Sequence, residues 1–525
     1  MSGSQFTTIQ TKHQATMQRT VLLFCGICIL RPILSFIPCT HIRSKGVELV
    51  TRQPPSPHCG GTTHPTRQTL EQFSSTGIVS KTSDRRLLPA SIAVGSITAF
   101  TGFLYGKALS FSQNGIWNRL GSNFASPYFI IAMCTLGGLL VGTLSSFMKS
   151  EFTVGDFVTS FSSSTVGTVP NSTSHLLPLL VTSLITSAFG FSLGPEAPMV
   201  CAGVLVGNTL AKKWNQNPTI LSYAGAAGTL TASMGIPIAG SIFALEMTRS
   251  STNMVSSSKA LPSSIAASIA ALFLLRGVLT PGAMMGGHFD YGIMGAITGR
   301  EAMGVALLGS VMGATVGTLF HKTVVVLKRI LWGTKGTYSR RRKILTKAGV
   351  GLLVGLLSTQ FPQTMFWGEG SLQTVIDGQQ TAFSATKHGL STAMTRLALV
   401  DPSIPWSAMG AAKVGLAKFV AIALASAGKF PGGIIFPLFF ASAPFAHVVA
   451  PLIAPSMLPI LVICTMAATQ ASATRTPLAT ALILSLMATP STELSVMLPA
   501  CLVASYGGVY VSELLSSKSY FQYSR

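Results

Sequence analysis

Long apolar runs repeatedly interrupted by glycine and proline are the feature of this sequence that most limits its possible folds. They recur from about residue 88 to the C-terminus, and several are shorter than the ~20 residues that a helix needs to span a bilayer. The chain contains 51 glycines and 28 prolines. Only 10% of its residues are charged, against about 25% in an ordinary soluble domain. The pattern predicts an all-α integral membrane protein in which several helices are broken.

Broken helices at membrane depth carry a functional implication. Their freed backbone N–H and C=O groups are tolerated only where neighbouring protein or a polar cavity satisfies them, which favours a transport pathway over a simple anchor. The runs that we expect to cross or partly cross the bilayer include Tyr128–Phe147, Leu176–Phe191, Leu261–Leu275, Ala302–Leu319 and Met457–Ala468.

The formal net charge of +22 does not indicate a nucleic-acid partner. The basic residues lie mainly near the N-terminus and in short loops between apolar runs. One stretch, Lys322–Lys347, contains nine Lys or Arg residues and no Asp or Glu. By the positive-inside rule this loop should face the cytosol or its equivalent compartment. The partners that we expect for the chain are membrane lipid and small anions.

Residues 1–86 are expected to be a leader that is cleaved and disordered. Lys12 and Arg19 precede the ten-residue apolar run Val21–Leu30, which has the length of a signal-peptide core. Residues 31–86 are rich in Ser, Thr, Pro and Arg and poor in acids. This two-part leader resembles that of algae with secondary plastids, which makes a chloroplast membrane our first choice of location; entry into the secretory pathway, with an endomembrane or plasma-membrane location, remains open.

The remaining chain, residues 87–525, is expected to form one membrane domain with an internal repeat. Pro237 and Pro477 lie in similar segments 240 residues apart, which suggests a first half over about 87–300 and a second over about 301–525. Some 40 residues before each proline comes an unusual stretch, Gly194–Pro198 (GPEAP) and Gly428–Pro437 (GKFPGGIIFP). Paired interruptions of this kind in two halves indicate a binding site near the middle of the membrane.

Each of these two stretches should end one segment and begin a helix. The first backbone N–H groups of a helix have no partner inside it, and the helix dipole adds partial positive charge there, so such an end suits an anion. Glu196 lies inside the first stretch, at a depth where an acidic residue costs roughly 2.5–3.5 kcal/mol. Its carboxylate can compete with the anion for the site and leave on protonation; equally, it can simply stabilise the first turn of the helix.

Four motifs together resemble the CLC family of chloride channels and chloride/proton exchangers. Leu193–Pro198 is similar to the family's GREGP motif, with Pro195 and Ala197 as departures, and Gly432–Pro437 is similar to GGIFAP. Gly235–Gly240, leading to Glu246, resembles NAPLAG, and Ala471–Leu478 resembles ASIRAPL. The four occur in the family's order between Leu193 and Leu478, and the resemblance covers a membrane domain of about 440 residues.

The resemblance implies a two-fold inverted repeat of broken and tilted helices and a homodimer with one pore per subunit. It implies that Glu196 is the gating glutamate, and that voltage or external pH opens the pathway by moving this side chain out of it. It also implies that Ile434 and Ile435 offer backbone N–H groups to the anion. Gly194 and Pro195 belong to the same anion site. The family's pore tyrosine corresponds to Tyr520 or Tyr523, of which we prefer Tyr520.

Two family positions differ in this chain. The first anion-binding stretch has decayed to Glu151–Asp156, where Thr153 supplies the hydroxyl by one alignment and Phe152 takes that place by another. Met247 replaces the internal proton-accepting glutamate of many exchangers, which favours a passive channel. A proton-coupled exchanger and a non-conducting family member remain alternatives.

Other residues receive more modest interpretations. Glu246 is expected to be structural, paired with backbone or with a neighbouring helix end. Lys429 either raises the local positive potential or extends to the interface, and His288 caps or is solvated in a Gly-rich loop. The motifs of common hydrolases are missing from the sequence, and its CxxC, Cys25 and Cys28, lies in an apolar run without a second pair, so we expect neither an enzyme nor a bound cofactor or metal. The sequence ends a few residues after its last apolar run, so we also expect no cytosolic CBS pair.

Overall fold

The computed structural model describes most of the chain beyond the predicted leader. Every described residue belongs to a compact unit that spans Val79–Arg525. Residues 1–81 lie outside the described part, so the division into leader and membrane domain stays a prediction. The described residues are 82–121, 127–147, 176–247, 254–280, 289–292, 297–333, 338–378, 407–489, 493–515 and 520.

The described residues are predominantly helical and contain no β-strand. The helices of the first half are α3 (Thr82–Gln113), α5 (Pro127–Phe147), α7 (Leu176–Ala188), α8 (Glu196–Lys213), α9 (Pro218–Met234), α10 (Pro237–Met247) and α11 (Met254–Leu272). Those of the second half are α12 (Gly299–Trp332), α13 (Arg340–Gln360), α14 (Leu372–Ile376), α16 (Ala408–Ala427), α17 (Ile435–Val448), α18 (Leu458–Thr474), α19 (Pro477–Leu486) and α20 (Leu494–Leu515).

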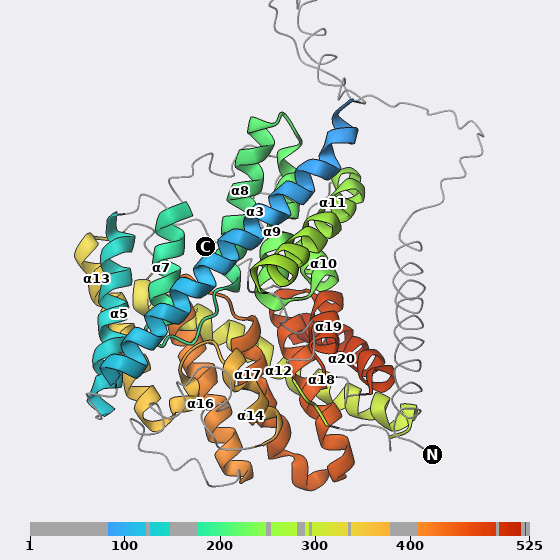
Figure 1. Cartoon of the computed structure of the whole chain (residues 1–525). Coiled ribbons are helices and arrows are strands. Elements are labelled where there is room, and N and C mark those ends of the chain that lie inside the picture. Colours follow the sequence, from blue (N-terminus) through green and yellow to red (C-terminus); the bar gives the residue numbers. More distant parts are fainter. Residues whose placement is uncertain are drawn as a thin grey trace, which may run out of the picture. The chain divides into compact units, whose positions relative to one another are not determined.

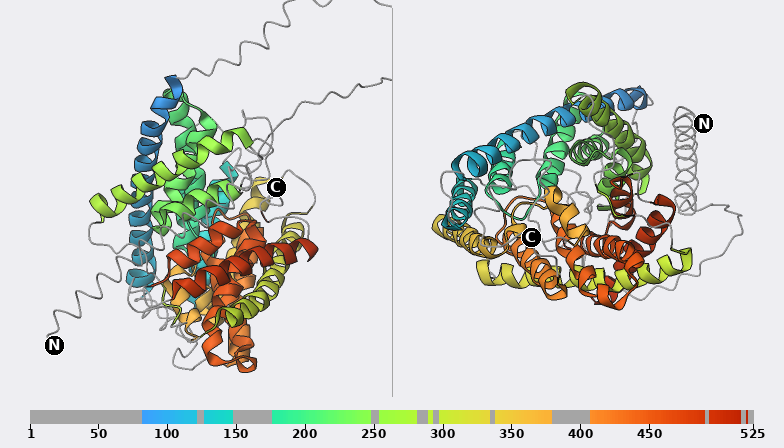
Figure 2. Two further views of the ribbon diagram at one scale, coloured as in Figure 1. Left: turned by 90° about the vertical axis from the view of Figure 1, so that its right-hand side faces the viewer. Right: turned by 60° about the horizontal axis from the view of Figure 1, so that its bottom comes forward.

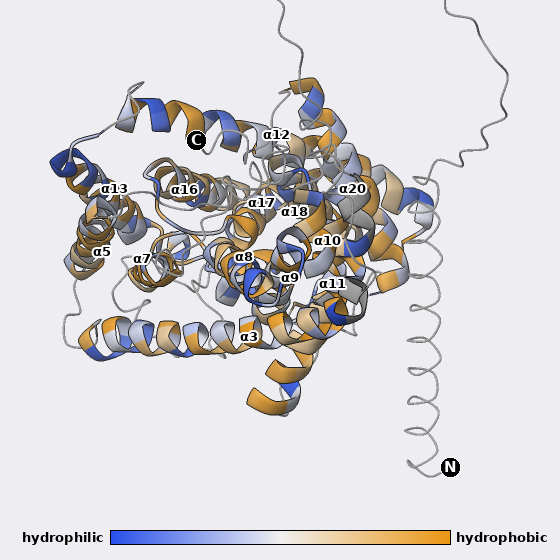
Figure 3. Cartoon of the chain, turned by 90° about the horizontal axis from the view of Figure 1, so that it is seen from above, coloured by the Kyte–Doolittle hydropathy of each residue, from blue (hydrophilic) through white to orange (hydrophobic). Residues whose placement is uncertain are grey.

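Seven of the described helices are long and apolar enough to cross a membrane, and the shorter apolar helices include α7, α17 and α19. This mixture of long and short helices is what the interrupted runs predict. Apolar residues recur along α3, which has many orange segments in Figure 3. Large apolar side chains are exposed on the outer helices, where they can contact lipid. On α3 they are Leu88, Ile92, Ile97, Phe100, Leu104 and Phe111.

The order of helices in the second half repeats that of the first. Helices α9 and α18 are both 17 residues long and lie 240 residues apart at both ends, 218 against 458 and 234 against 474. Each is followed by a residue in the left-handed conformation and then by a short helix that begins with proline. The internal repeat inferred around Pro237 and Pro477 is therefore present in the fold.

The two halves pack against each other through equivalent and non-equivalent helices. Helix α10 packs against its counterpart α19, and α5 of the first half packs along α13 of the second (Figure 1 and Figure 2). Helix α17 packs against α16 and α18, so the second interrupted stretch leads into a helix that is surrounded by protein. The core thus forms around the ends of the broken helices.

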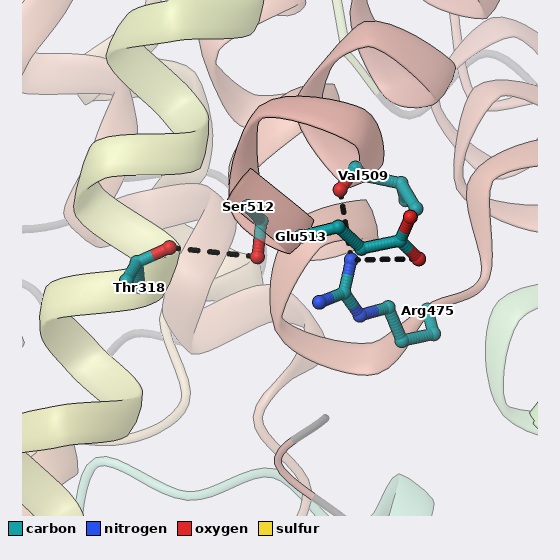
Figure 4. Close-up of polar contacts among 5 residues, drawn as sticks. All are labelled: Thr318, Arg475, Val509, Ser512 and Glu513. Atoms are coloured by element: carbon teal, nitrogen blue, oxygen red, sulfur yellow. Dashed lines mark hydrogen bonds and ion pairs between the residues drawn. The ribbon is translucent and has the colours of Figure 1, made fainter. Parts of the chain in front are cut away.

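The left-handed residue between the paired helices differs between the halves. Gly235 has φ 73° after α9, whereas the equivalent position after α18 is Arg475 with φ 63°. A side chain at such a φ is unfavourable, so other contacts must hold it. Arg475 Nη1 donates to the Val509 carbonyl at 2.8 Å and lies 3.5 Å from the Glu513 carboxylate, both on α20 (Figure 4).

We expect these two contacts of Arg475 to contribute unequally to stability. Glu513 is 60% exposed, and an ion pair with so exposed a partner is worth about 1 kcal/mol or less. Glu513→Gln should therefore barely change the thermal unfolding temperature. Arg475→Met also removes the charged donor to Val509, worth about 1.5–3 kcal/mol, and should lower that temperature clearly. Equal effects of the two substitutions would contradict this ranking.

Candidate anion-binding site

The first interrupted stretch ends at the N-terminus of α8, as the sequence predicts. Helix α8 begins at Glu196, directly after Pro195. The first helical hydrogen bond runs from the Met199 N–H to the Pro195 carbonyl at 3.0 Å. The N–H groups of Glu196 and Ala197 precede this bond and so have no acceptor within the helix.

The second stretch ends at the N-terminus of α17 in the same way. Helix α17 begins at Ile435, with Ile434 as the preceding capping residue. Its first helical hydrogen bond joins the Leu438 N–H to the Ile434 carbonyl at 3.0 Å. The N–H groups of Ile435 and Phe436 therefore also point out of the helix start. Both ends of interest present backbone donors and the positive end of a helix dipole.

These two helix starts lie at one place because the two stretches cross each other. Gly194 and Gly433 form an isolated antiparallel pair, in which each donates its N–H to the carbonyl of the other at 2.9 and 2.5 Å. The rings of Phe191 and Phe430 stack with centroids 4.2 Å apart and brace the crossing. Sequence reasoning placed both stretches at a common site but did not foresee this direct backbone pairing.

The carboxylate of Glu196 occupies the crossing. The side chain is only 2% exposed, and a methyl group added to Gly194 or to Gly433 would overlap its oxygen Oε2. Within the described part of the chain, Oε2 has no hydrogen-bond partner. Glu369, nine residues after the end of α13, and Tyr105 of α3 lie within electrostatic reach of this carboxylate. An acidic group therefore sits where two helix N-termini meet.

Tyr520 comes close to the second stretch. Its ring lies 5.7 Å from that of Phe320, and its hydroxyl lies near Ser426, two residues before Gly428. Its role towards the anion stays a prediction. Thr153, the alternative Phe152, Tyr523 and His288 lie outside the described residues, so the predictions about them stay open.

The interpretation of Glu246 as a structural residue is confirmed. Its carboxylate accepts hydrogen bonds from the backbone N–H groups of Leu478 at 3.2 Å and Ala479 at 2.8 Å. These groups belong to the first turn of α19, so the acid of one half caps the equivalent helix of the other half. Met247, the next residue, is 5% exposed and packs in the core.

Lys429 lies against aromatic rings at the edge of the site. Its ammonium is 5.0 Å from the ring centre of Trp332 and 5.1 Å from that of Tyr338. Tyr338 lies two residues before α13, whose first residues are the basic run around Arg341. The side chain thus lies against the rings of Trp332 and Tyr338, and both interpretations of Lys429, a raised local potential and an extension to the interface, stay predictions.

Sequence reasoning missed a further part of the site, which we call the wall segment, residues 361–371. It follows α13 and contains two short 3-10 turns. Its carbonyls receive hydrogen bonds from Lys418 of α16 and from Ser192, two residues before the first stretch. The signal that could have revealed it is Lys418 itself, a basic residue in the middle of an apolar helix.

A multi-pass helical membrane domain with two crossed helix N-termini around a buried carboxylate defines an anion-transport protein. The family model described as voltage gated chloride channel matches residues 167–508, and the chain belongs to this family. The ion-transport protein YfeO of Escherichia coli strain UMN026 is 27% identical over 363 residues, 67% of this chain and 76% of the relative. YfeO of strain SMS-3-5 is 26% identical over the same shares.

Solved structures with a similar fold are also transporters of this type. A slow cyanobacterial Cl-/H+ antiporter aligns with a TM-score of 0.65 at 17% identity, over 83% of this chain and 96% of the other. A CLC-type fluoride/proton antiporter gives 0.60 at 18% identity, over 83% and 97%. The predicted fold class, an inverted repeat of broken and tilted helices of the CLC type, is thereby confirmed.

Proposed function

We propose that the protein is a channel for chloride or a similar small anion, gated by Glu196. The observation that carries the proposal is the position of the Glu196 carboxylate at the crossing of the two stretches, against Gly194 and Gly433. A negative group held there takes the place that an anion would occupy. The backbone donors of α8 and α17 become available to the anion when the carboxylate leaves.

The chemistry of this site suits conduction. Backbone N–H groups and helix dipoles attract an anion by about 0.3–2 kcal/mol per helix end, which is weak enough for the ion to leave again. Protonation neutralises Glu196 and removes its competition, so acidification should open the pathway. Because the carboxylate is charged within the membrane, the membrane potential also acts on it, which supports control by voltage.

The channel is favoured over an exchanger because of Met247. A buried thioether can neither accept nor release a proton, so this position cannot carry protons from the inner side. A proton-coupled exchanger is the second candidate, since the two proteins of similar fold described above are named as proton antiporters. A non-conducting member of the family is the third.

The test is a flux assay on the purified full chain in liposomes, in which chloride efflux and proton movement are recorded together. For the native protein we expect chloride efflux that rises as the pH falls, without stoichiometric proton uptake. Glu196→Ala should conduct at every pH with no pH dependence. Proton uptake in fixed ratio to chloride would favour the exchanger, and absence of flux from both proteins would favour the non-conducting member.

We also propose a homodimer with one pore per subunit in a chloroplast membrane. The resemblance to the family supports the dimer, and the two-part character of residues 1–86 supports the location. Light-scattering mass measurement of the detergent-solubilised protein tests the first. Microscopy of a fluorescent fusion in a cell with secondary plastids tests the second; a label confined to the secretory pathway would contradict it.

A further inference from the structure

The wall segment is fastened to α16 by a lysine at membrane depth. Lys418 is fully buried, and its ammonium donates to the carbonyls of Thr364 at 3.0 Å, Met365 at 3.4 Å and Phe366 at 2.7 Å. The ammonium also lies 4.8 Å from the ring centre of Phe440 on α17. An ammonium group has three donors, and three carbonyls meet them.

Burial of the Lys418 ammonium costs free energy, which suggests that the residue has a functional role. Within the described residues, Lys418 has no carboxylate within ion-pair distance, so carbonyl dipoles and the ring of Phe440 face its positive charge in place of a counter-ion. A basic residue in the middle of an apolar helix is expensive in the membrane, and such residues commonly mark functional sites. Hydrogen bonds from a charged donor are also stronger than those between neutral groups, so they hold the wall segment firmly.

The wall segment in turn supports the backbone that leads to the gate. The Ser192 hydroxyl donates to the Thr364 carbonyl, the same oxygen that Lys418 binds. The Phe366 N–H donates to the Gly190 carbonyl at 3.3 Å. Residues 190–192 run directly into the crossing, and Glu196 lies four residues beyond Ser192. A continuous chain of contacts therefore leads from Lys418 to the gate.

The opposite side of the wall segment contacts the second stretch's helix. Gly368 approaches Phe440 of α17 so closely that an added Cβ would lie 3.1 Å from the Phe440 Cβ. Phe440 is the same residue whose ring lies beside the Lys418 ammonium. The wall segment thus lies between the chain that leads to α8 and the helix α17, and its position bears on how the two stretches cross.

We propose that Lys418 is a positioning residue for the gate: by fastening the wall segment, it holds the first stretch so that the Glu196 carboxylate stays at the crossing with Gly433. The inference rests on the proposed gating function. Lys418 itself does not contact the anion in this proposal. Loosening this fastening should let the carboxylate leave more readily, while the pathway itself remains.

The test compares Lys418→Met in the native and in the Glu196→Ala background, using chloride efflux from liposomes as a function of pH. Methionine keeps the length of the side chain and removes the charge and the three donors. In the native background we expect efflux at neutral pH to rise about fivefold, towards that of Glu196→Ala, with a flatter pH profile. In the Glu196→Ala background the same substitution should change efflux by less than about twofold.

Ser192→Ala is the milder second variant, because it removes one donor to Thr364 and leaves Lys418 in place. It should shift the pH profile in the same direction by a smaller amount. Lys413→Met is the control: Lys413 is an exposed lysine on the same helix α16, five residues before Lys418, so this variant removes a lysine charge without touching the wall segment. It should leave the pH profile unchanged.

The outcomes separate this inference from the proposed function. Equal loss of efflux from Lys418→Met in both backgrounds would show a role in the fold or on the anion itself, and it would overturn the positioning role. An unchanged pH profile in both Lys418→Met and Ser192→Ala would overturn it as well. A native protein whose efflux does not depend on Glu196 would instead refute the proposed function, whatever Lys418 does.

Discussion

Gly194→Ala is expected to open the pathway as fully as removal of the gate carboxylate itself. The three atoms nearest to a new methyl group at Gly194 are Oε1, Oε2 and Cδ of Glu196, all at the end of one flexible side chain. The Glu196 side chain can rotate away from the new methyl group, whereas a backbone atom in the same place could not move so easily. The Glu196 carboxylate should therefore be pushed out of the crossing while the helix starts of α8 and α17 stay in place.

The size of the effect follows from the interaction that is lost. A carboxylate at two helix N-termini is held by about 1–2 kcal/mol, so its displacement should raise chloride efflux at neutral pH by about tenfold. Efflux should also lose its dependence on pH, since the titrating group no longer blocks the site. The measurement is chloride efflux from liposomes between acidic and alkaline pH, with native protein and Glu196→Ala in parallel.

A double variant supplies the control for Gly194→Ala. With Glu196→Ala already present, the methyl group at position 194 has room, so the second substitution should change efflux by less than about twofold. Gly432→Ala offers a contrast, because its methyl group would overlap the Cβ of Leu193 rather than the gate. Loss of efflux from Gly194→Ala in both backgrounds would mean that the methyl group damages the anion site itself.

The sequence predicted much of the fold because the interruptions in its apolar runs carry strong local information. Pro237 and Pro477 mark helix starts, and the Gly/Pro stretches before them end at the N-termini of α8 and α17. Both signals depend on a few neighbouring residues, since proline lacks an N–H and suits the first turn of a helix. For the same reason, the residues around Glu196 are enough to place it at a helix start.

The remaining parts of the site depend on contacts between distant segments, which local patterns do not encode. The pairing of Gly194 with Gly433 joins residues 239 positions apart (433 less 194), and the contact of Lys418 with the wall segment bridges more than 50. Neither has a motif of its own. The Arg475 conformation was also unforeseen, because the equivalent residue in the first half is Gly235 and a left-handed arginine is uncommon.

Glu246→Ala is expected to destabilise the protein more than any substitution at the site. The two backbone donors that its carboxylate accepts, on Leu478 and Ala479, lie at the start of α19, where no other residue of the helix can satisfy them. Each buried donor left without an acceptor costs about 1–3 kcal/mol, so the loss from the two donors should be about 2–6 kcal/mol. Because α10 and α19 pack across the two halves, the loss weakens the contact between the repeats.

The thermal unfolding temperature of the purified protein in detergent measures this effect, with two variants beside it. Glu246→Gln keeps one carbonyl oxygen as acceptor and should lose about half as much stability as Glu246→Ala. Met247→Leu changes the neighbouring core residue at nearly constant volume and should cost less than about 1.5 kcal/mol. If Glu246→Ala unfolded at the same temperature as Met247→Leu, the cap would contribute nothing, and the two halves would be held together by apolar packing alone.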